Sequence, residues 1–468
     1  MASLPNPPRQ GWLSTKLFST SAFLLGARLL GAGAGFLVQL ILARWLSPQE
    51  LGVYFPATSL VVVGGFLASH GYPSIATRFV SRYRGPGGAV FLRRFVWRAQ
   101  SETFILALAI TALVMAGAAW WPGIDSQSRI AILLAAATIP FVASFRIYGS
   151  LAASTRAFRL AYLPDVCLKP VVLLVGLGLL LLAKGDIGLV EVMLVLGGAT
   201  IVLSLAQRVL LARELPVALN IRGRLGSRRA GSQSVEALWR RQAHAVLLVA
   251  VFAQYLPELS ILLATPILGA SDIGVFGLCL KLAFLVGFFV LMTQTIATPD
   301  IADALGRGGE GSGGSKLAAS CFAATGVSLL ATLACALWGD EVLRLFGPNF
   351  VAGHAALVML VATQLVRATF GPTNAVLTLV GAQKTNLAVT ALGMAVLALS
   401  TLVLGALFGL NGAAAALLAT VLFWSAISAI MLHRTAGVRV DLLSAIGSAR
   451  AAAASEPPLS PSRQPSSG

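Results

Sequence analysis

The chain has 468 residues, of which 57% are hydrophobic and 11% are charged. Soluble domains carry about 25% charged residues, so this composition excludes an ordinary soluble protein, whose surface it could not cover. Lysine and arginine number 34 and aspartate and glutamate 17, which gives a net charge of +17. In a membrane protein such an excess is typical of basic cytoplasmic loops, so we expect no nucleic-acid partner.

Long apolar segments recur from one end of the chain to the other. Each has close to the roughly 20 residues that cross the hydrocarbon layer of a bilayer. The sequence predicts an all-α integral membrane protein with about twelve transmembrane helices, the last two forming a tight hairpin. The predicted spans are 17–43, 51–76, 100–121, 129–153, 161–183, 187–211, 243–265, 272–298, 317–338, 352–379, 386–408 and 411–432.

Basic residues alternate between successive connections. The connection after span two holds six arginines and no acid, and the one after span six holds eight arginines against Glu214 and Glu236. The intervening connections are poor in base. The positive-inside rule then places both termini in the cytoplasm, which requires an even number of spans.

A polar, arginine-rich stretch divides the predicted spans six and six. It predicts a cytoplasmic N-terminal segment (1–16), an N-lobe (17–211), a basic cytoplasmic linker (212–242), a C-lobe (243–432) and a cytoplasmic tail (433–468). The end of the tail is rich in Ala, Ser and Pro, a composition typical of disorder.

An internal repeat links the two halves. The segment LSPQELGVY at 46–54 reappears as LGASDIGVF at 268–276, at an offset of 222 residues (272 − 50). Further echoes relate 74–77 to 295–298 and, more weakly, 157–159 to 382–384. Short membrane turns can resemble each other by chance, but three ordered echoes favour two six-helix lobes related by a pseudo-twofold axis. A substrate cavity between such lobes can open alternately to each side.

The first copy of the repeat carries a family resemblance. The run LARWLSPQELGVY at 42–54 resembles the first hairpin of the Wzx-type polysaccharide-export flippases, members of the MATE-like multidrug/oligosaccharidyl-lipid/polysaccharide superfamily. The family turn is matched by Arg44, Pro48, Glu50 and Gly52, and its degenerate second copy by Asp272 and Gly274.

The resemblance implies a flippase of the bacterial inner membrane. Its substrate would be an undecaprenyl-pyrophosphate-linked oligosaccharide for O-antigen, capsule or exopolysaccharide, moved by alternating access with no cofactor. Implied partners are this substrate, membrane lipids, and polysaccharide polymerase and chain-length proteins. The fourteen-span lipid II flippases, with an extra C-terminal helix pair, fit less well.

Charged residues inside the spans are candidates for the transport site, because a lone charge at the bilayer centre costs about 2.5–3.5 kcal/mol. We expect cations to line the cavity and to bind the pyrophosphate and any uronic acids of the substrate. Two alternatives remain open: Lys281 pairs with Glu258, or Arg146 reaches the cytoplasmic interface. The predicted cavity cations are Arg28, Arg146, Lys281 and Arg367.

Span seven carries an acid between two prolines. Glu258 is predicted to be either a protonatable coupling site or an ion-pair partner, with Pro257 and Pro266 breaking the helix around it. In span five, Asp165 and Lys169 are spaced i, i+4, which predicts an intrahelical ion pair.

Two other functions compete with the flippase. A MATE-type multidrug or cation antiporter would use the same architecture but would need carboxylates in its cavity. A membrane glycan polymerase or ligase would need a large periplasmic loop, which the predicted spans do not leave. No HExxH motif is present, and the glycine-rich stretch 306–316 lacks the ending of a phosphate-binding loop. We therefore expect no enzyme, no catalytic residue and no metal site.

Overall fold

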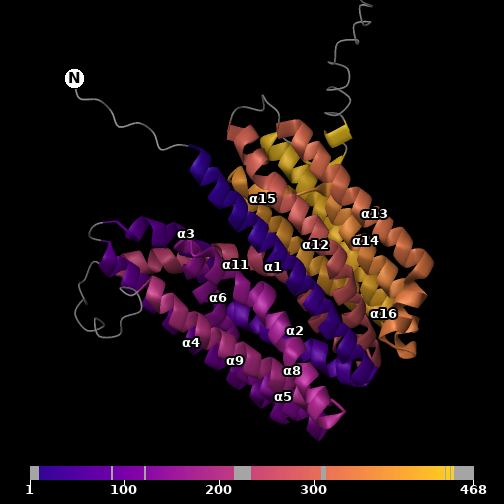
Figure 1. Cartoon of the computed structure of the whole chain (residues 1–468). Coiled ribbons are helices and arrows are strands. Elements are labelled where there is room, and N and C mark those ends of the chain that lie inside the picture. The colour runs from indigo at the N-terminus through magenta and orange to yellow at the C-terminus, as the bar shows by residue number, and fades with distance from the viewer. Residues whose placement is uncertain are drawn as a thin grey trace, which may run out of the picture. The chain divides into compact units, whose positions relative to one another are not determined.

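The computed structural model describes residues 10–85, 88–120, 123–215, 233–306, 313–437, 439–442 and 444–446. In these ranges the chain is built from helices and contains no strand (Figure 1). Eleven helical segments of the described part of the chain are long and apolar enough to cross a membrane. The predicted all-α membrane fold is confirmed.

The first half of the chain folds into the following elements: α1 (Gln10–Trp45), α2 (Pro48–Ala68), α3 (Tyr72–Tyr83), α4 (Ala89–Trp120), α5 (Ser126–Ala137), α6 (Ile139–Ser154), α7 (Phe158–Leu163), the π-helical η1 (Pro164–Leu168), α8 (Lys169–Lys184) and α9 (Leu189–Glu214).

The second half begins after the predicted linker. It comprises α11 (Gln233–Ala264), α12 (Ala270–Gly306), α13 (Gly313–Phe346), the 3-10 helix η4 (Pro348–Gly353), α14 (His354–Phe370), α15 (Thr373–Leu379) and α16 (Gln383–Ala436).

The last helix, α16, is two spans in one element. Its 54 residues would extend about 80 Å as a straight helix, far more than a bilayer core of about 30 Å. Gly409 breaks it, with φ 57° and ψ −134°. A Cβ on Gly412 would collide with the Leu404 carbonyl oxygen, so the chain folds back on itself there. The predicted final hairpin is confirmed, and counting its two arms separately brings the candidate spans of the described chain to twelve.

The chain forms two compact units, one of residues 1–278 with 343–352 and the other of residues 279–342 with 353–468. Of the predicted linker 212–242, residues 233–242 belong to α11, and Trp239 in this stretch is fully buried. Residues 216–232 lie outside the described ranges. In the predicted tail, Val440 and Ala445 are buried, and residues 447–468 lie outside the described ranges. The proposed lobe boundaries stay predictions.

The two copies of the repeat touch each other inside the first unit. A Cβ on Gly52 would collide with the carbonyl oxygen of Ala270, and a Cβ on Gly274 would collide with that of Pro48. These contacts are equivalent, because 270 − 48 and 274 − 52 both equal the repeat offset of 222. The backbones of α2 and α12 therefore cross where both copies carry glycine.

Phe55 marks the axis that relates the two copies. Its ring packs on Gly277, where an added Cβ would collide with a ring carbon. These residues are equivalent, since 277 − 55 is again 222. Equivalent residues of two copies meet where a twofold axis relates them, so this contact is the one expected of a pseudo-twofold between α2 and α12.

The family-like turn begins α2. Ser47 is its N-cap and Pro48 its first residue, and a capping box joins Ser47 to Glu50: the Glu50 N–H donates to Ser47 Oγ at 3.2 Å and the Ser47 N–H to Glu50 Oε2 at 2.8 Å. Arg44 donates from Nε to the carbonyl of Leu345 at 2.6 Å, in the last turn of α13. These residues set the entry and direction of α2, which is a structural role.

We expect Gly52→Ala to destabilise the protein by about 1–3 kcal/mol, because the new Cβ collides with a backbone oxygen that cannot swing away. The measurement is thermal unfolding of the purified protein in detergent. Gly33→Ala is the matched control, since no atom lies within 4 Å of its added Cβ. Equal melting temperatures for the two variants would contradict the close crossing.

Candidate functional site

A cavity of about 190 Å³ lies inside the first compact unit, between α2, α6, η1, α8, α9 and α11. At about 30 Å³ per water it has room for about six waters. Its wall is apolar apart from a few polar side chains: Arg146, Asp165, Lys169, Thr200 and Tyr255.

Irregular helices surround the cavity. Tyr255 has non-helical angles (φ −124°, ψ 24°) two residues before Pro257, which lacks an N–H and crowds the preceding turn. The predicted break of span seven at Pro257 is confirmed, whereas Pro266 lies beyond the end of α11. Asp165, which also lines the cavity, belongs to the π-helix η1, a type of turn that is rare and recurs at functional sites.

Helix α1 packs closely against this π-helical turn. A Cβ on Gly31 would collide with the carbonyl oxygen of Val166 in η1, so only glycine fits there. The other glycines of α1 that the sequence singles out, Gly26, Gly33 and Gly35, have no atom within 4 Å of an added Cβ. For Gly31 the structure supports close helix packing.

Arg146 of α6 points between two aromatic rings. Its guanidinium carbon lies 4.5 Å from the centroid of Phe66 on α2 and 5.1 Å from that of Tyr255 on α11. One guanidinium nitrogen donates to the Tyr255 hydroxyl. The rings hold the cation by cation–π attraction inside the helix bundle.

The charge of Arg146 has no carboxylate partner in the described part of the chain. Its Nε is buried and makes no hydrogen bond there. The cavity wall holds two cations, Arg146 and Lys169, and one carboxylate, Asp165, a formal sum of 2 − 1 = +1. Asp165 offsets only one of the two positive charges, and a net charge inside a membrane helix bundle is costly, so the wall favours an anionic ligand.

Asp165 and Lys169 line the same cavity, but the described residues contain no ion pair between them. The predicted intrahelical pair is therefore wrong. The i, i+4 rule assumes α-helical turns, whereas the turn from Pro164 to Leu168 closes i→i+5 hydrogen bonds and changes the alignment.

The other predicted site residues are half-buried and lie in different units. Arg28 on α1 and Glu258 on α11 belong to the first unit, and Lys281 on α12 and Arg367 on α14 belong to the second. The Arg367 carbonyl accepts a hydrogen bond from Gln294 at 3.2 Å. The shared substrate cavity and the alternative Lys281–Glu258 pair stay predictions.

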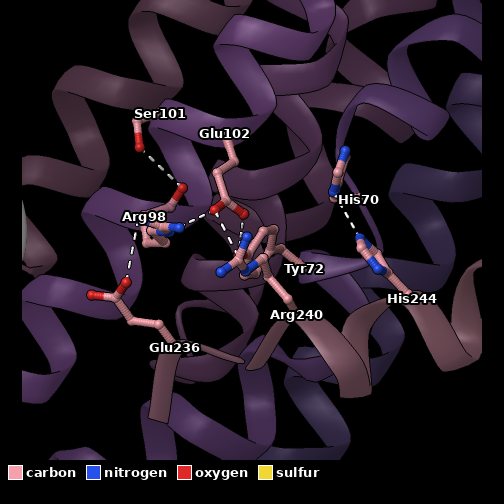
Figure 2. A network of polar contacts seen from close by, with 8 residues as sticks. All are labelled: His70, Tyr72, Arg98, Ser101, Glu102, Glu236, Arg240 and His244. Carbon is pink, nitrogen blue, oxygen red and sulfur yellow. Dashed lines mark hydrogen bonds and ion pairs between the residues drawn. The ribbon is translucent and has the colours of Figure 1, made fainter. Parts of the chain in front are cut away.

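A second polar cluster joins α3, α4 and α11 (Figure 2). Glu102 lies at its centre: its carboxylate is 2.5 Å from Arg98 Nε and 4.0 Å from Arg240 Nε, and it accepts a hydrogen bond from the Tyr72 hydroxyl at 2.6 Å. Arg98 also pairs with Glu236 at 3.3 Å. Ion pairs thus attach the first turns of α11 to α4, and the Tyr72 hydrogen bond attaches α4 to α3.

Aromatic packing beneath this cluster reinforces the attachment. Trp239 is fully buried, with its ring centroid 5.2 Å from that of Phe95 and its N–H donating to the Tyr83 hydroxyl at 3.2 Å. His70 and His244 meet ring to ring, with nitrogens 2.9 Å apart (Figure 2). The sequence interpretation missed this region. Trp239, a large apolar residue within an arginine-rich stretch, was the sequence feature that could have indicated a packed helix there.

Comparisons with known proteins place this fold. No family model matches the chain, and no curated protein matches it. Among solved structures, the lipid II flippase MurJ in an inward closed conformation is 12% identical and matches 88% of this chain and 87% of its own, with a TM-score of 0.67.

Two MATE transporters are also similar. A multidrug resistance MATE family transporter of the MOP superfamily, in an inward-facing conformation, is 15% identical over 92% of this chain and 99% of its own, with a TM-score of 0.64. The MATE multidrug transporter DinF-BH is 14% identical over 88% of this chain and 95% of its own, with a TM-score of 0.57.

The chain therefore has the fold shared by MurJ and the MATE transporters, as the sequence predicted. The twelve predicted spans made a lipid II flippase, which has fourteen, the less fitting comparison. The MurJ structure nevertheless matches with a TM-score at least as high as those of the two MATE transporters. The narrower resemblance to Wzx-type flippases stays a prediction.

We expect Glu102→Gln to destabilise the protein by about 1–3 kcal/mol, because a partly buried carboxylate that serves two arginines and a tyrosine loses its charge. Thermal unfolding in detergent measures the effect. Glu214→Gln removes the same charge from an exposed position at the end of α9 and should leave the melting temperature unchanged. A comparable loss in both variants would show that the cluster is not structural.

Proposed function

We propose that this protein is a flippase that moves an anionic, lipid-linked oligosaccharide across the bacterial inner membrane for surface polysaccharide synthesis. Arg146 is the observation that carries the proposal: a cation within a membrane helix, facing a cavity, with no carboxylate partner among the described residues. The fold, shared with a lipid II flippase and with MATE transporters, supports transport.

The chemistry of the cavity suits the pyrophosphate of such a substrate. A guanidinium binds phosphate oxygens with charge-assisted hydrogen bonds, the Tyr255 hydroxyl offers a further donor, and Lys169 adds a second positive charge. Because Phe66 and Tyr255 already hold Arg146, little side-chain entropy is lost when an anion binds. A volume of about 190 Å³ accommodates the phosphates, and the glycan would need a wider passage.

A MATE-type antiporter for cations is the second candidate. Asp165 in the cavity wall and Glu258, three residues beyond Tyr255, are the carboxylates it would use. The net positive wall disfavours a cationic drug, since the fixed charges would repel it. The flippase therefore remains the better supported function.

Transport by alternating access would use the pseudo-twofold contact as a pivot. The crossing at Gly52 and Gly274 holds two backbones together without side chains between them, so the two helices would stay in contact there while their far ends move. The cytoplasmic termini, and the polysaccharide polymerase and chain-length proteins as partners, belong to the same proposal.

Deletion of the gene in its host tests the proposal against the antiporter. Loss of surface glycan, with lipid-linked repeat units accumulating on the cytoplasmic leaflet, is the result expected of the flippase. Unchanged glycan display with lowered drug resistance would establish the antiporter and overturn the proposal.

We expect Arg146→Gln to lower surface glycan at least tenfold while the protein level in the membrane is retained, because a charge-assisted contact worth about 1.5–3 kcal/mol is lost. Quantitative glycan staining beside immunoblotting measures both. Arg159→Gln is the matched control: this arginine also lies over a ring, 4.9 Å from the Phe23 centroid, but is exposed and outside the cavity. Full glycan display in the Arg146→Gln variant would show that Arg146 does not bind the substrate.

The same assay tests Arg28 and Lys281, the other two cations for which the sequence most strongly predicts a place in the cavity. We expect Arg28→Ala and Lys281→Ala to reduce surface glycan with unchanged protein levels, because each would remove a positive charge from the substrate's path. Wild-type glycan display in both variants would show that neither residue contacts the substrate.

A further inference from the structure

A second cavity, of about 310 Å³, lies in the second compact unit where α16 ends. The end of α14, the start of α15 and the segment after α16 complete its wall, which is mainly apolar. Three basic side chains, His433, Arg434 and Arg439, stand on its lining, and all three are exposed. The proposed transport site does not use any of them.

The cavity changes from apolar to basic along α16. Ala426, Ala429, Ile430 and His433 follow at i, i+3, i+4 and i+7, so they form one stripe of the helix surface. The arm of α16 after Gly409 has 27 residues, about 40 Å, and its last turns therefore lie beyond a hydrocarbon layer of about 30 Å. A hydrocarbon layer that begins at the Gly409 break would place the basic end of the stripe at headgroup level and the apolar end at acyl-chain level.

The segment after α16 is docked against the helices. Gly371, at φ +64°, leaves space for the Val440 carbonyl oxygen, with which an added Cβ would collide. The Cys321 thiol donates to the same oxygen at 3.7 Å, and Ala445 is buried against Cys321. Because its neighbour Val440 is fixed in this way, the backbone of Arg439 is held beside the cavity.

The basic side chains are available to a ligand. None of His433, Arg434 and Arg439 makes an ion pair within the part of the chain that the structure describes. The acid in the wall, Asp441, has a local role, since its carboxylate accepts the backbone N–H of Ser444 at 2.9 Å and begins the short turn that carries Ala445. The two arginines therefore give the rim a net positive charge.

We propose that this cavity binds an anionic phospholipid, with the headgroup phosphate at Arg434 and Arg439 and an acyl chain along Ala426, Ala429 and Ile430. Basic residues in the last turn of a helix also interact with its dipole, which accounts for His433 and Arg434. It does not account for Arg439 or for the apolar hollow beside them. The arginine distribution predicts this end of α16 to be cytoplasmic, where anionic lipids give the leaflet a negative surface potential.

The test measures lipid binding to the purified full-length protein, stripped of lipid and titrated with phosphatidylglycerol or phosphatidylcholine in mixed micelles. Native mass spectrometry counts bound lipids, and thermal unfolding reports stabilisation. We expect phosphatidylglycerol to bind at least tenfold more tightly than phosphatidylcholine. The R434Q/R439Q variant should lose that preference, whereas the control R213Q/R241Q, which removes two exposed arginines of the first unit, should retain it.

A second variant tests the apolar half of the site. Ala429→Phe fills the groove without changing charge and should weaken phosphatidylglycerol binding at least tenfold. Inorganic phosphate alone should not stabilise the wild-type protein, since the acyl chain contributes to binding. Equal loss of preference in R213Q/R241Q, unchanged binding by Ala429→Phe, or stabilisation by phosphate alone equal to that by the lipid would each overturn the proposal.

Discussion

The architecture of the first unit depends on two backbones that cross in direct contact. At Gly52 and at Gly274, a carbonyl oxygen of the other helix occupies the space that a Cβ would need. Lipid chains are as apolar as most side chains of a membrane helix, so close packing of this kind drives helix association in a bilayer. The contact fixes the start of α2 against the start of α12. The capping box at Ser47 and Glu50 then directs α2 toward the cavity wall that it forms with α6 and α11.

The cavity depends on breaks in regular helices. A straight α11 would not have the turn that places Tyr255 opposite Arg146, and an α-helical turn in place of η1 would orient Asp165 differently. Backbone irregularity inside a membrane is tolerated where protein or a wet cavity satisfies the freed groups. Here the irregular turns and the charged side chains coincide, so the same few residues provide both the space and its electrostatic character.

The sequence predicted the features that follow from local rules. Span length and hydropathy predicted the helices, the short link at 409–410 predicted the last hairpin, and Pro257 predicted the break in α11. The constant offset of the repeat predicted the pseudo-twofold. Features that need tertiary proximity were not predictable: the aromatic pair around Arg146 comes from helices far from α6 along the chain, with Tyr255 109 residues away. Because Trp239 falls in the predicted linker, the sequence did not predict the buried cluster that attaches α11 to α3 and α4.

The pairing of Phe55 with Gly277 limits how alike the two halves of this protein can be. Two identical residues would pack poorly at this contact: two phenylalanines would occupy the same volume, and two glycines would leave a void between α2 and α12. One large and one small residue solve the problem only together, so a single exchange at either position is penalised until the other follows. At this contact, steric packing therefore requires the two copies of the duplicated sequence to differ.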